Sequence, residues 1–365
     1  MSSSDTQVNA QRPKQLAFKP DFDEAVHRCE AFFNGDIIDR PIVCVNAHRE
    51  GYPEVPSSSY HDRVFGDMDK LIDQMVLSAE GTFYGGEAFP VGWLSFGCDE
   101  IACFCGAELE WSEGSGDTNW AKPFVEDWDS VLPLRIRPDN PLWQRILTFY
   151  RKAAERAAGK MLLYNLDLHS NIGLLRSLRG SEQLCMDLVD NPEAIDRAMA
   201  SARAIFPIIW NAIAEAGKMK ERGFCHGLYS LEGYACLQCD FSCMIGPRMF
   251  DRWVLPALEE EAEIVKHAIY HWDGPDAIKH ADALIATKGL HTLSYVPGEG
   301  RGTHLDYIDL LQRVQKGGKA VEVWGSPDQI KLLHRKLRPE KTIFRSWVGT
   351  PAEAEELLEW FKKNT

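Results

Sequence analysis

His271 and Asp273 stand two residues apart in the stretch IYHWDG, and this spacing is the first sign of chemistry in the sequence. On a β-strand, residues two apart point to the same side, so the imidazole and the carboxylate would face one space. Such a pair can act as a general acid and base, or it can bind a divalent metal ion. It also fits an ordinary strand end, because Gly274 and Pro275 follow directly. The pair alone leaves these three interpretations open.

The elements that would position this pair are short apolar runs that alternate with helical patterns. Continuous apolar runs of this length are typical of strands buried on both faces of a parallel sheet. The clearest runs cover residues 40–47, 161–167, 224–230, 268–273, 292–296, 320–325 and 342–347. Strand–helix alternation favours right-handed crossovers, and about eight strand candidates predict a (β/α)8 TIM barrel. No glycine-rich phosphate loop follows these runs, which disfavours a nucleotide-binding fold.

The chain is predicted to form one domain with a tail and an insertion. Residues 1–19 are mostly polar, so we expect a disordered N-terminal tail. Residues 20–365 carry the predicted barrel. Near residues 83–128 the pattern becomes irregular and rich in glycine, tryptophan and cysteine, which predicts an inserted segment.

Charge and cysteine usage narrow the class of protein. The net charge of −14 argues against nucleic acid and anionic membranes as partners, and leaves a small molecule as the expected ligand. The sequence contains no apolar run of about 18 residues, the length that would span a membrane. Ten cysteines occur in a chain without a secretion signal, which predicts reduced thiols and a cytoplasmic location.

Polar side chains at the ends of the predicted strands form a further group of candidates, because barrel enzymes place their chemistry there. His226 and Tyr229, in the stretch CHGLYS, are candidates for catalysis and for orienting a substrate. The same rule draws attention to Glu322 and Arg345 on the last two runs. The sequence assigns these last two no specific role.

Five other residues are expected to contact a substrate. Arg49, beside His48 after the first run, could hold a carboxylate through two parallel hydrogen bonds. Asp240 lies in the stretch QCDFS, where it could position a ligand or cap the following helix. Arg301 and Trp324 follow two of the late runs.

Several segments, taken in order, carry a family resemblance. They are PFVEDWDSVLPLRIRPDNPLW (123–143), LRGSEQLCMDLVDNPEAIDRAM (178–199), LQCDFSCMIGPRMFDRWVLPAL (237–258), IYHWDGPDAIKH, LHTLSYVPGEG and SWVGTPAEAEELLEW. Together they resemble the uroporphyrinogen decarboxylase superfamily. The resemblance implies a (β/α)8 barrel and one of two branches. One branch is a metal-free decarboxylase; the other comprises zinc-dependent methyltransferases that work with corrinoid proteins and coenzyme M.

The resemblance places His271 on the histidine of the His-x-Cys zinc motif of the methyltransferase branch, and Asp273 stands at the cysteine position. It implies zinc or another divalent metal held by His271, Asp273 and, from the next strand end, Glu299. The expected activity is methyl transfer on a small acidic or thiol substrate, with Arg49 holding the acid group. A corrinoid protein and a second copy of the chain, in a homodimer, are the partners that the resemblance implies.

Two alternatives remain beside this hypothesis. The first is a metal-free decarboxylase or lyase, in which His271 and Asp273 act as general acid and base on a carboxylated substrate. The second is a ligand-binding barrel without catalytic activity.

Overall fold

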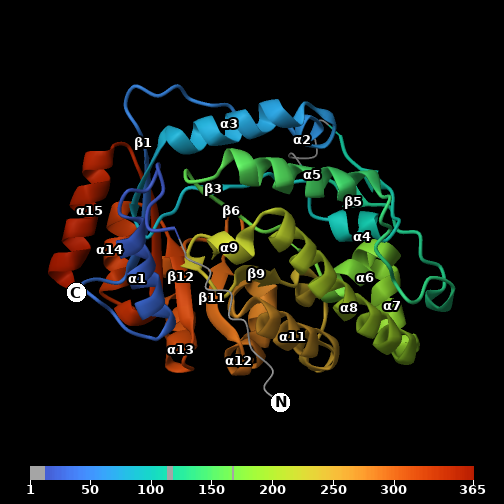
Figure 1. The fold of residues 1–365 in the computed structure, drawn as a ribbon. Coiled ribbons are helices and arrows are strands. Elements are labelled where there is room, and N and C mark those ends of the chain that lie inside the picture. The colour runs from blue at the N-terminus through green and yellow to red at the C-terminus, as the bar shows by residue number, and fades with distance from the viewer. Residues whose placement is uncertain (1–12, 113–117, 167) are drawn as a thin grey trace, which may run out of the picture.

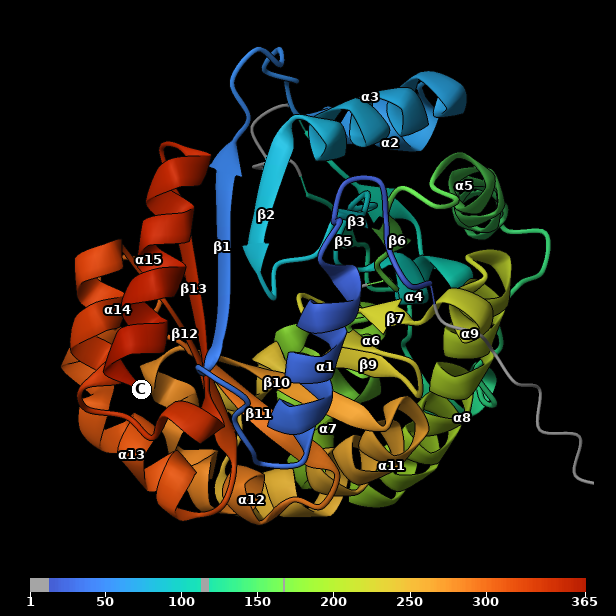
Figure 2. The same ribbon diagram turned by 60° about the vertical axis from the view of Figure 1, so that its left-hand side comes forward.

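A seven-stranded β-sheet forms the centre of the structure, a computed structural model that describes residues 13–112, 118–166 and 168–365 (Figure 1; Figure 2). The strand order is β2-β1-β13-β12-β11-β10-β9. Neighbouring strands run parallel, except that β2 is antiparallel to β1. The strands span Ile42–His48 (β1), Thr82–Gly86 (β2), Tyr234–Gln238 (β9), His267–Asp273 (β10), Leu290–Val296 (β11), Ala320–Trp324 (β12) and Thr342–Val348 (β13).

Helices in the second half of the chain cover this sheet. They are α11 (Leu255–Val265), α12 (Ala281–Ala286), α13 (Ile308–Lys316), α14 (Pro327–His334) and α15 (Pro351–Asn364). The helix α15 contacts β1 and β2, α14 contacts β13, and α13 contacts β12. Ser326 and Gln329 form a capping box at the start of α14, and Thr350 caps α15. The predicted alternation of parallel strands and helices is therefore confirmed over this half.

Ten further α-helices come from the described part of residues 22–249 (Figure 1). They are α1 (Phe22–Phe33), α2 (Tyr60–Phe65), α3 (Met68–Glu80), α4 (Glu100–Phe104), α5 (Pro141–Arg156), α6 (Asn171–Arg179), α7 (Ser181–Asp190), α8 (Pro192–Ala216), α9 (Met219–Arg222) and α10 (Pro247–Met249). Asp67 caps α3 and Asn140 caps α5, each by accepting backbone N–H groups of the first turn. The helices α3 and α5 pack against each other, and α5 packs on α8.

Three short strand pairs lie beside the main sheet. They are β3 (Val91–Gly92) with β6 (Leu162–Leu163), β4 (Leu109–Glu110) with β5 (Trp120–Ala121), and β7 (Phe224–Cys225) with β8 (Tyr229–Ser230). The strand β7 contacts both β6 and β9. Over the described residues the hydrogen-bonded sheet nevertheless stays open between β2 and β9. The structure thus shows a mixed α/β fold with a large parallel sheet, and it does not show a closed barrel.

The end of the expected N-terminal tail lies within the described residues. Residues 1–12 of the expected tail lie outside the described residues, but Leu16, Phe18 and Lys19 are buried. The Lys19 ammonium group donates to the backbone oxygens of Tyr84 at 2.8 Å and Gly86 at 2.6 Å. The last residues of the expected tail thus pack against β2 in this structure.

The predicted insertion is only partly irregular. Residues 83–128 contain most of β2, the short strands β3, β4 and β5, and the helix α4, while residues 113–117 lie outside the described part. Within the described ranges, no helix is both long and apolar enough to cross a membrane.

The strand direction defines the side of the molecule where chemistry is expected. The strand β1 runs toward the side on which α2 and α3 lie (Figure 2). Because β9 to β13 run parallel to β1, their carboxyl ends lie on the same side of the sheet. This end is called the carboxyl edge below.

Candidate functional site

An ion pair joins the two last strands midway along their length. Arg345 on β13 donates from Nε to Oε1 of Glu322 on β12. Ser294 on β11 donates its hydroxyl to the other carboxylate oxygen, Oε2, at 2.7 Å. In the strand register, His271 on β10 lies beside Ser294, and Cys44 on β1 lies beside Arg345. The register partner of Glu322 on β13 is Ile343, so Arg345 and Cys44 lie two residues further along their strands. Residues two apart on a strand share a face, so these five side chains face the same side across five strands, and they are called the row below.

Both members of the pair carry their charges. Burial on its own raises the pKa of Glu322, but the charge of Arg345 and the hydrogen bond from Ser294 outweigh it and place the pKa below its ordinary value. Burial acts to lower the pKa of Arg345, and Glu322 reverses this and raises it. The side chain of Arg345 keeps 27% of its surface exposed, against 12% for Glu322. The guanidinium is therefore fixed by Glu322, on a side chain that is partly open to solvent.

His226 faces this row from the loop after β7. Burial lowers the pKa of its imidazole to about 3, with Arg345 and His271 acting in the same direction and Glu322 opposing them. The ring is therefore neutral at pH 7. It contacts Tyr164 at 4.5 Å and Tyr234 at 6.1 Å between ring centroids.

Two buried polar atoms, one in this ring and one on its neighbour Tyr234, lack a hydrogen-bond partner within the described ranges. Among the described residues, the Nδ1 atom of His226 and the hydroxyl of Tyr234 are buried without a hydrogen-bond partner. Leaving a buried polar group unpaired costs about 1–3 kcal/mol, and such groups are rare unless they serve a ligand or another function. Together with the partly exposed Arg345, they make this row the best candidate for a functional site in the described chain.

Gly227 packs directly on the guanidinium, and this contact gives a first testable prediction. Its φ is +81°, and a Cβ built there would lie 2.2 Å from Nη2 of Arg345. Gly227→Ala should therefore displace Arg345 as well as strain the backbone. Gly159 is the matched control, because its φ is +70° and nothing lies within 4 Å of its Cβ position.

We expect Gly159→Ala to lower the free energy of unfolding by about 1 kcal/mol, the cost of a left-handed backbone. Gly227→Ala should cost about 1–3 kcal/mol more, because it adds a steric clash. Urea unfolding of both variants measures the difference. Equal losses would show that Arg345 moves aside freely.

The three predicted metal ligands do not come together. His271 is half-buried within the row, but Asp273 at the end of β10 and Glu299 in the following loop are exposed. The described residues contain no group of three His, Cys, Asp or Glu side chains arranged to hold a metal ion. Asp273 does not cap the next helix either, since the residue at that cap is Gly274 and no side chain bonds there. In this structure the donor set does not fit a metal, and only His271 joins the row.

His48 and Arg49, which are predicted to contact a substrate, bond to backbone oxygens in this structure. His48 shares a hydrogen bond with the backbone oxygen of Tyr52 at 3.0 Å. Arg49 donates from Nη2 to the backbone oxygen of Phe18 at 3.3 Å, while its Nε atom is buried without a partner. These contacts tie the loop after β1 to the N-terminal segment. A substrate contact at Arg49 stays a prediction.

Tyr229 is a core residue in this structure. Its side chain is buried, its hydroxyl donates to the backbone oxygen of Arg222 at 3.1 Å, and its ring contacts Phe22 at 5.1 Å. The hydroxyl is therefore engaged in holding the end of α9.

Asp240 and Arg301 lie outside the row, whereas Trp324 is the strand partner of Arg345. Asp240 lines a cavity of about 350 Å³ with His169, whose Nδ1 lies 3.8 Å from its carboxylate. Arg301 is exposed in the loop after β11. Trp324 follows Glu322 by two residues, is 39% exposed, and packs edge-on against His304 at 4.2 Å. Trp324 thus faces the same side as Glu322, nearer the carboxyl edge.

The comparisons with known proteins support the fold. No family model matches the sequence, and no curated protein matches it significantly. A search of solved structures finds similarity to a methyltransferase from Methanosarcina mazei, with a TM-score of 0.60 and 14% sequence identity. The likeness covers 93% of this chain and 98% of that one. At this level of identity it shows that the two chains share a fold over nearly their whole length.

Proposed function

We propose that this chain is an enzyme that acts on a small carboxylated molecule at the carboxyl edge, and that its reaction is a methyl transfer. The observation that carries the proposal is Arg345, whose charged guanidinium is fixed by Glu322 beside a neutral His226 and whose side chain is partly exposed. An arginine held in one orientation suits a carboxylate, which it can bind through two parallel N–H groups. Methyl transfer is supported by the shared fold with a methyltransferase and by the resemblance of the sequence segments.

The proposal treats the sheet as the larger part of a (β/α)8 barrel. In such a barrel the active site lies at the carboxyl ends of the strands, and a substrate that enters there would reach the row from His271 to Arg345 midway along the strands. A substrate carboxylate beside Arg345 would add negative charge next to His226 and so raise the pKa of that imidazole. Binding would thereby prepare His226 to accept or share a proton from the substrate.

A metal has no assigned step in this proposal. Zinc or another divalent ion at His271, Asp273 and Glu299 would require the loop that carries Glu299 to move toward His271. A corrinoid protein as methyl donor and a homodimer belong to the same proposal through the sequence resemblance.

A second candidate function is a metal-free decarboxylase or lyase. The dispersed donor set favours it, since the described residues bring together an arginine, a carboxylate and imidazoles instead of a metal site. In that case Arg345 would hold one carboxylate of the substrate and His226 or His271 would exchange the proton.

Binding of mercaptoacetate and of its methyl ester tests the shared part of both candidates. We expect the acid to bind more tightly than the ester in isothermal titration calorimetry. Arg345→Lys should weaken binding of the acid about tenfold, because an ammonium group cannot form the paired contact. Arg338→Lys, at the exposed pair with Glu340, should leave binding unchanged. Equal affinities for acid and ester would exclude Arg345 as a carboxylate site.

Product analysis then separates the two reactions. Incubation with free methylcobalamin should give S-methylated mercaptoacetate, detectable by mass spectrometry, if the reaction is methyl transfer. Release of carbon dioxide from a panel of carboxylic acids, without transfer of a methyl group, would instead support the lyase.

A further inference from the structure

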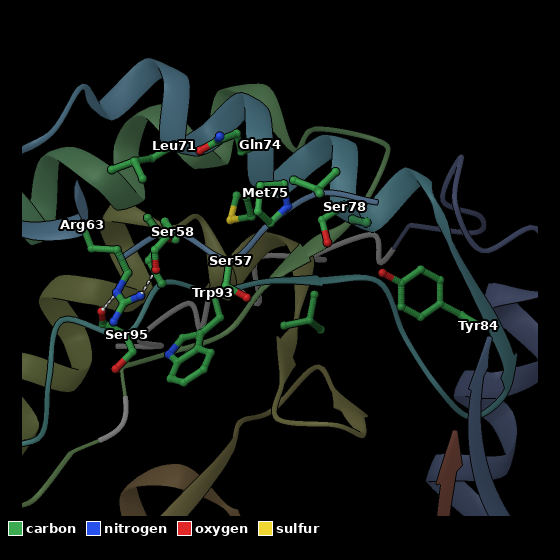
Figure 3. Close-up of a pocket in the computed structure, with 15 residues that line it drawn as sticks. Ser57, Ser58, Arg63, Leu71, Gln74, Met75, Ser78, Tyr84, Trp93 and Ser95 are labelled. Atoms are coloured by element: carbon green, nitrogen blue, oxygen red, sulfur yellow. Dashed lines mark hydrogen bonds between the residues drawn. The ribbon is translucent and has the colours of Figure 1, made fainter. Parts of the chain in front are cut away.

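A separate cavity of about 540 Å³ lies between α3 and the segment after β3 (Figure 3). Leu71, Gln74 and Met75 of α3 line one side, and Trp93 and Ser95 line the other. The loop between β1 and α2 supplies further serine hydroxyls at its mouth. Three separate parts of the chain thus shape this space, which none of the predicted site residues lines.

The lining is uncharged apart from one arginine. It combines apolar and aromatic side chains with serine hydroxyls and one amide, and it contains no acidic residue. The exception, Arg63, is buried and donates to the backbone oxygens of Ser58 and Ser95. Its guanidinium therefore fastens the two walls together. A cavity of this composition suits a neutral ring that carries hydroxyl groups.

Aromatic contacts connect this cavity to the row at Arg345. Trp93 is 46% exposed, and its ring meets Tyr164 at 5.8 Å with the planes at 72°. The ring of Tyr164 in turn lies 4.5 Å from that of His226. Tyr164 therefore stands between Trp93 at the cavity and the imidazole beside Arg345. A ligand that followed the ring of Tyr164 would connect the two places.

We infer that this cavity, called the Trp93 cavity here, binds the uncharged ring of the same substrate whose carboxylate lies at Arg345. The inference rests on the proposed function and narrows its substrate to acids that carry a hydroxylated aromatic ring on a short chain. Trp93 would stack on the ring, and the serine hydroxyls and Gln74 would bond its hydroxyl group. The chain between ring and acid would pass along Tyr164.

Binding of a graded series of acids tests the inference. The probes are acetate, para-hydroxyphenylacetate, para-hydroxyphenylpropionate and para-hydroxyphenylbutyrate, each measured by calorimetry beside its methyl ester. We expect one of the phenolic acids to bind about tenfold or more tightly than acetate, since a buried aromatic ring adds at least that much. Trp93→Ala should remove this advantage and leave acetate binding unchanged.

Two further variants keep the test decisive. Trp120→Ala is the matched control, because Trp120 is 42% exposed in the β4–β5 pair and does not line the cavity. It should preserve the preference for the phenolic acid. Ser78→Phe places a large side chain at an exposed lining position of α3, so it should block the phenolic acids selectively.

The outcomes distinguish this inference from the proposed function. Phenolic acids that bind no better than acetate, or that bind equally well to the Trp93→Ala variant, would overturn the Trp93 cavity as a subsite and leave the Arg345 site standing. Acids and methyl esters of equal affinity would overturn the Arg345 site, and the present inference would fall with it.

Discussion

Replacing Arg345 by methionine should lower the free energy of unfolding by about 3 kcal/mol. The substitution leaves the Glu322 carboxylate largely buried, with the Ser294 hydroxyl as its remaining donor among the described contacts, and breaking a buried pair in this way costs about 3–5 kcal/mol. We expect the lower end of this range, because 27% of the arginine side chain is exposed and water can partly solvate the unpaired Glu322 carboxylate. Urea unfolding at pH 7 measures the loss.

The double variant tests whether the unpaired charge is the cause. Glu322→Met combined with Arg345→Met removes both charges, so it should recover most of the stability lost in the single variant. Arg338→Met is the control: its partner Glu340 lies near the surface, and removing an exposed pair should cost less than about 1 kcal/mol. A double variant as unstable as the single one would show that packing of the Arg345 side chain, and not its charge, stabilises the fold.

The late strands could be predicted because their residue types decide their structure locally. The runs that became β10, β11, β12 and β13 are rich in β-branched and aromatic residues bounded by glycine, proline or charged turns. The strand β9, with the sequence YACLQ, was missed because alanine, cysteine and glutamine give no clear strand pattern. The strand β9 forms by pairing with β10, and this tertiary contact cannot be predicted from the residues of β9 alone.

The site could be predicted only in part for a related reason. Alternation places Glu322 and Arg345 on candidate faces of their strands, but only the folded structure shows that Ser294 and Arg345 reach the same carboxylate. Tyr234 lies on the missed strand and so could not be considered. Strand order and register depend on contacts between distant segments, so the residue pattern of a single sequence does not reveal them.

The path of one loop explains why the predicted metal ligands separate. Glu299 lies between Gly298 and Gly300, whose φ values are +87° and +70°. Left-handed backbone at these positions turns the loop in a direction that residues with side chains rarely follow. Distance along the sequence made Glu299 a reasonable partner for His271, but the turns direct it into solvent.

A different buried carboxyl should control how stability depends on pH. Glu261 on α11 is 2% exposed and accepts a hydrogen bond from the Ser170 hydroxyl at 2.6 Å. The amide of Asn171 lies 3.5 Å from its other oxygen. Burial raises the pKa of Glu261 from 4.5 to about 8, although both hydrogen bonds oppose the shift. The folded protein therefore holds a proton on Glu261 that the unfolded chain releases near pH 4.5.

The sign of the effect follows from this difference in bound protons. Between about pH 4.5 and pH 8 the folded state binds more protons than the unfolded state at this residue, so rising pH lowers stability, by at most about 1.4 kcal/mol per pH unit. Below that window both states are protonated, and above it both are ionised, so the contribution is flat. Glutamine at this position stays neutral and keeps an oxygen for the Ser170 hydroxyl.

The difference in unfolding free energy between Glu261→Gln and the unmodified chain should therefore shift by about 3 kcal/mol in favour of the variant from pH 5 to pH 8. Urea unfolding across that range measures it. Glu260→Gln is the control on the same helix. Burial acts to raise the pKa of Glu260, but its hydrogen bond to Arg203 is the larger effect and lowers it, so its contribution is already constant above pH 5. Its difference from the unmodified chain should stay below about 1 kcal/mol and not change with pH. If the Glu261→Gln difference were equally flat, the carboxyl would be ionised in the folded state, and the Ser170 and Asn171 hydrogen bonds would be sufficient to hold a negative charge inside the protein.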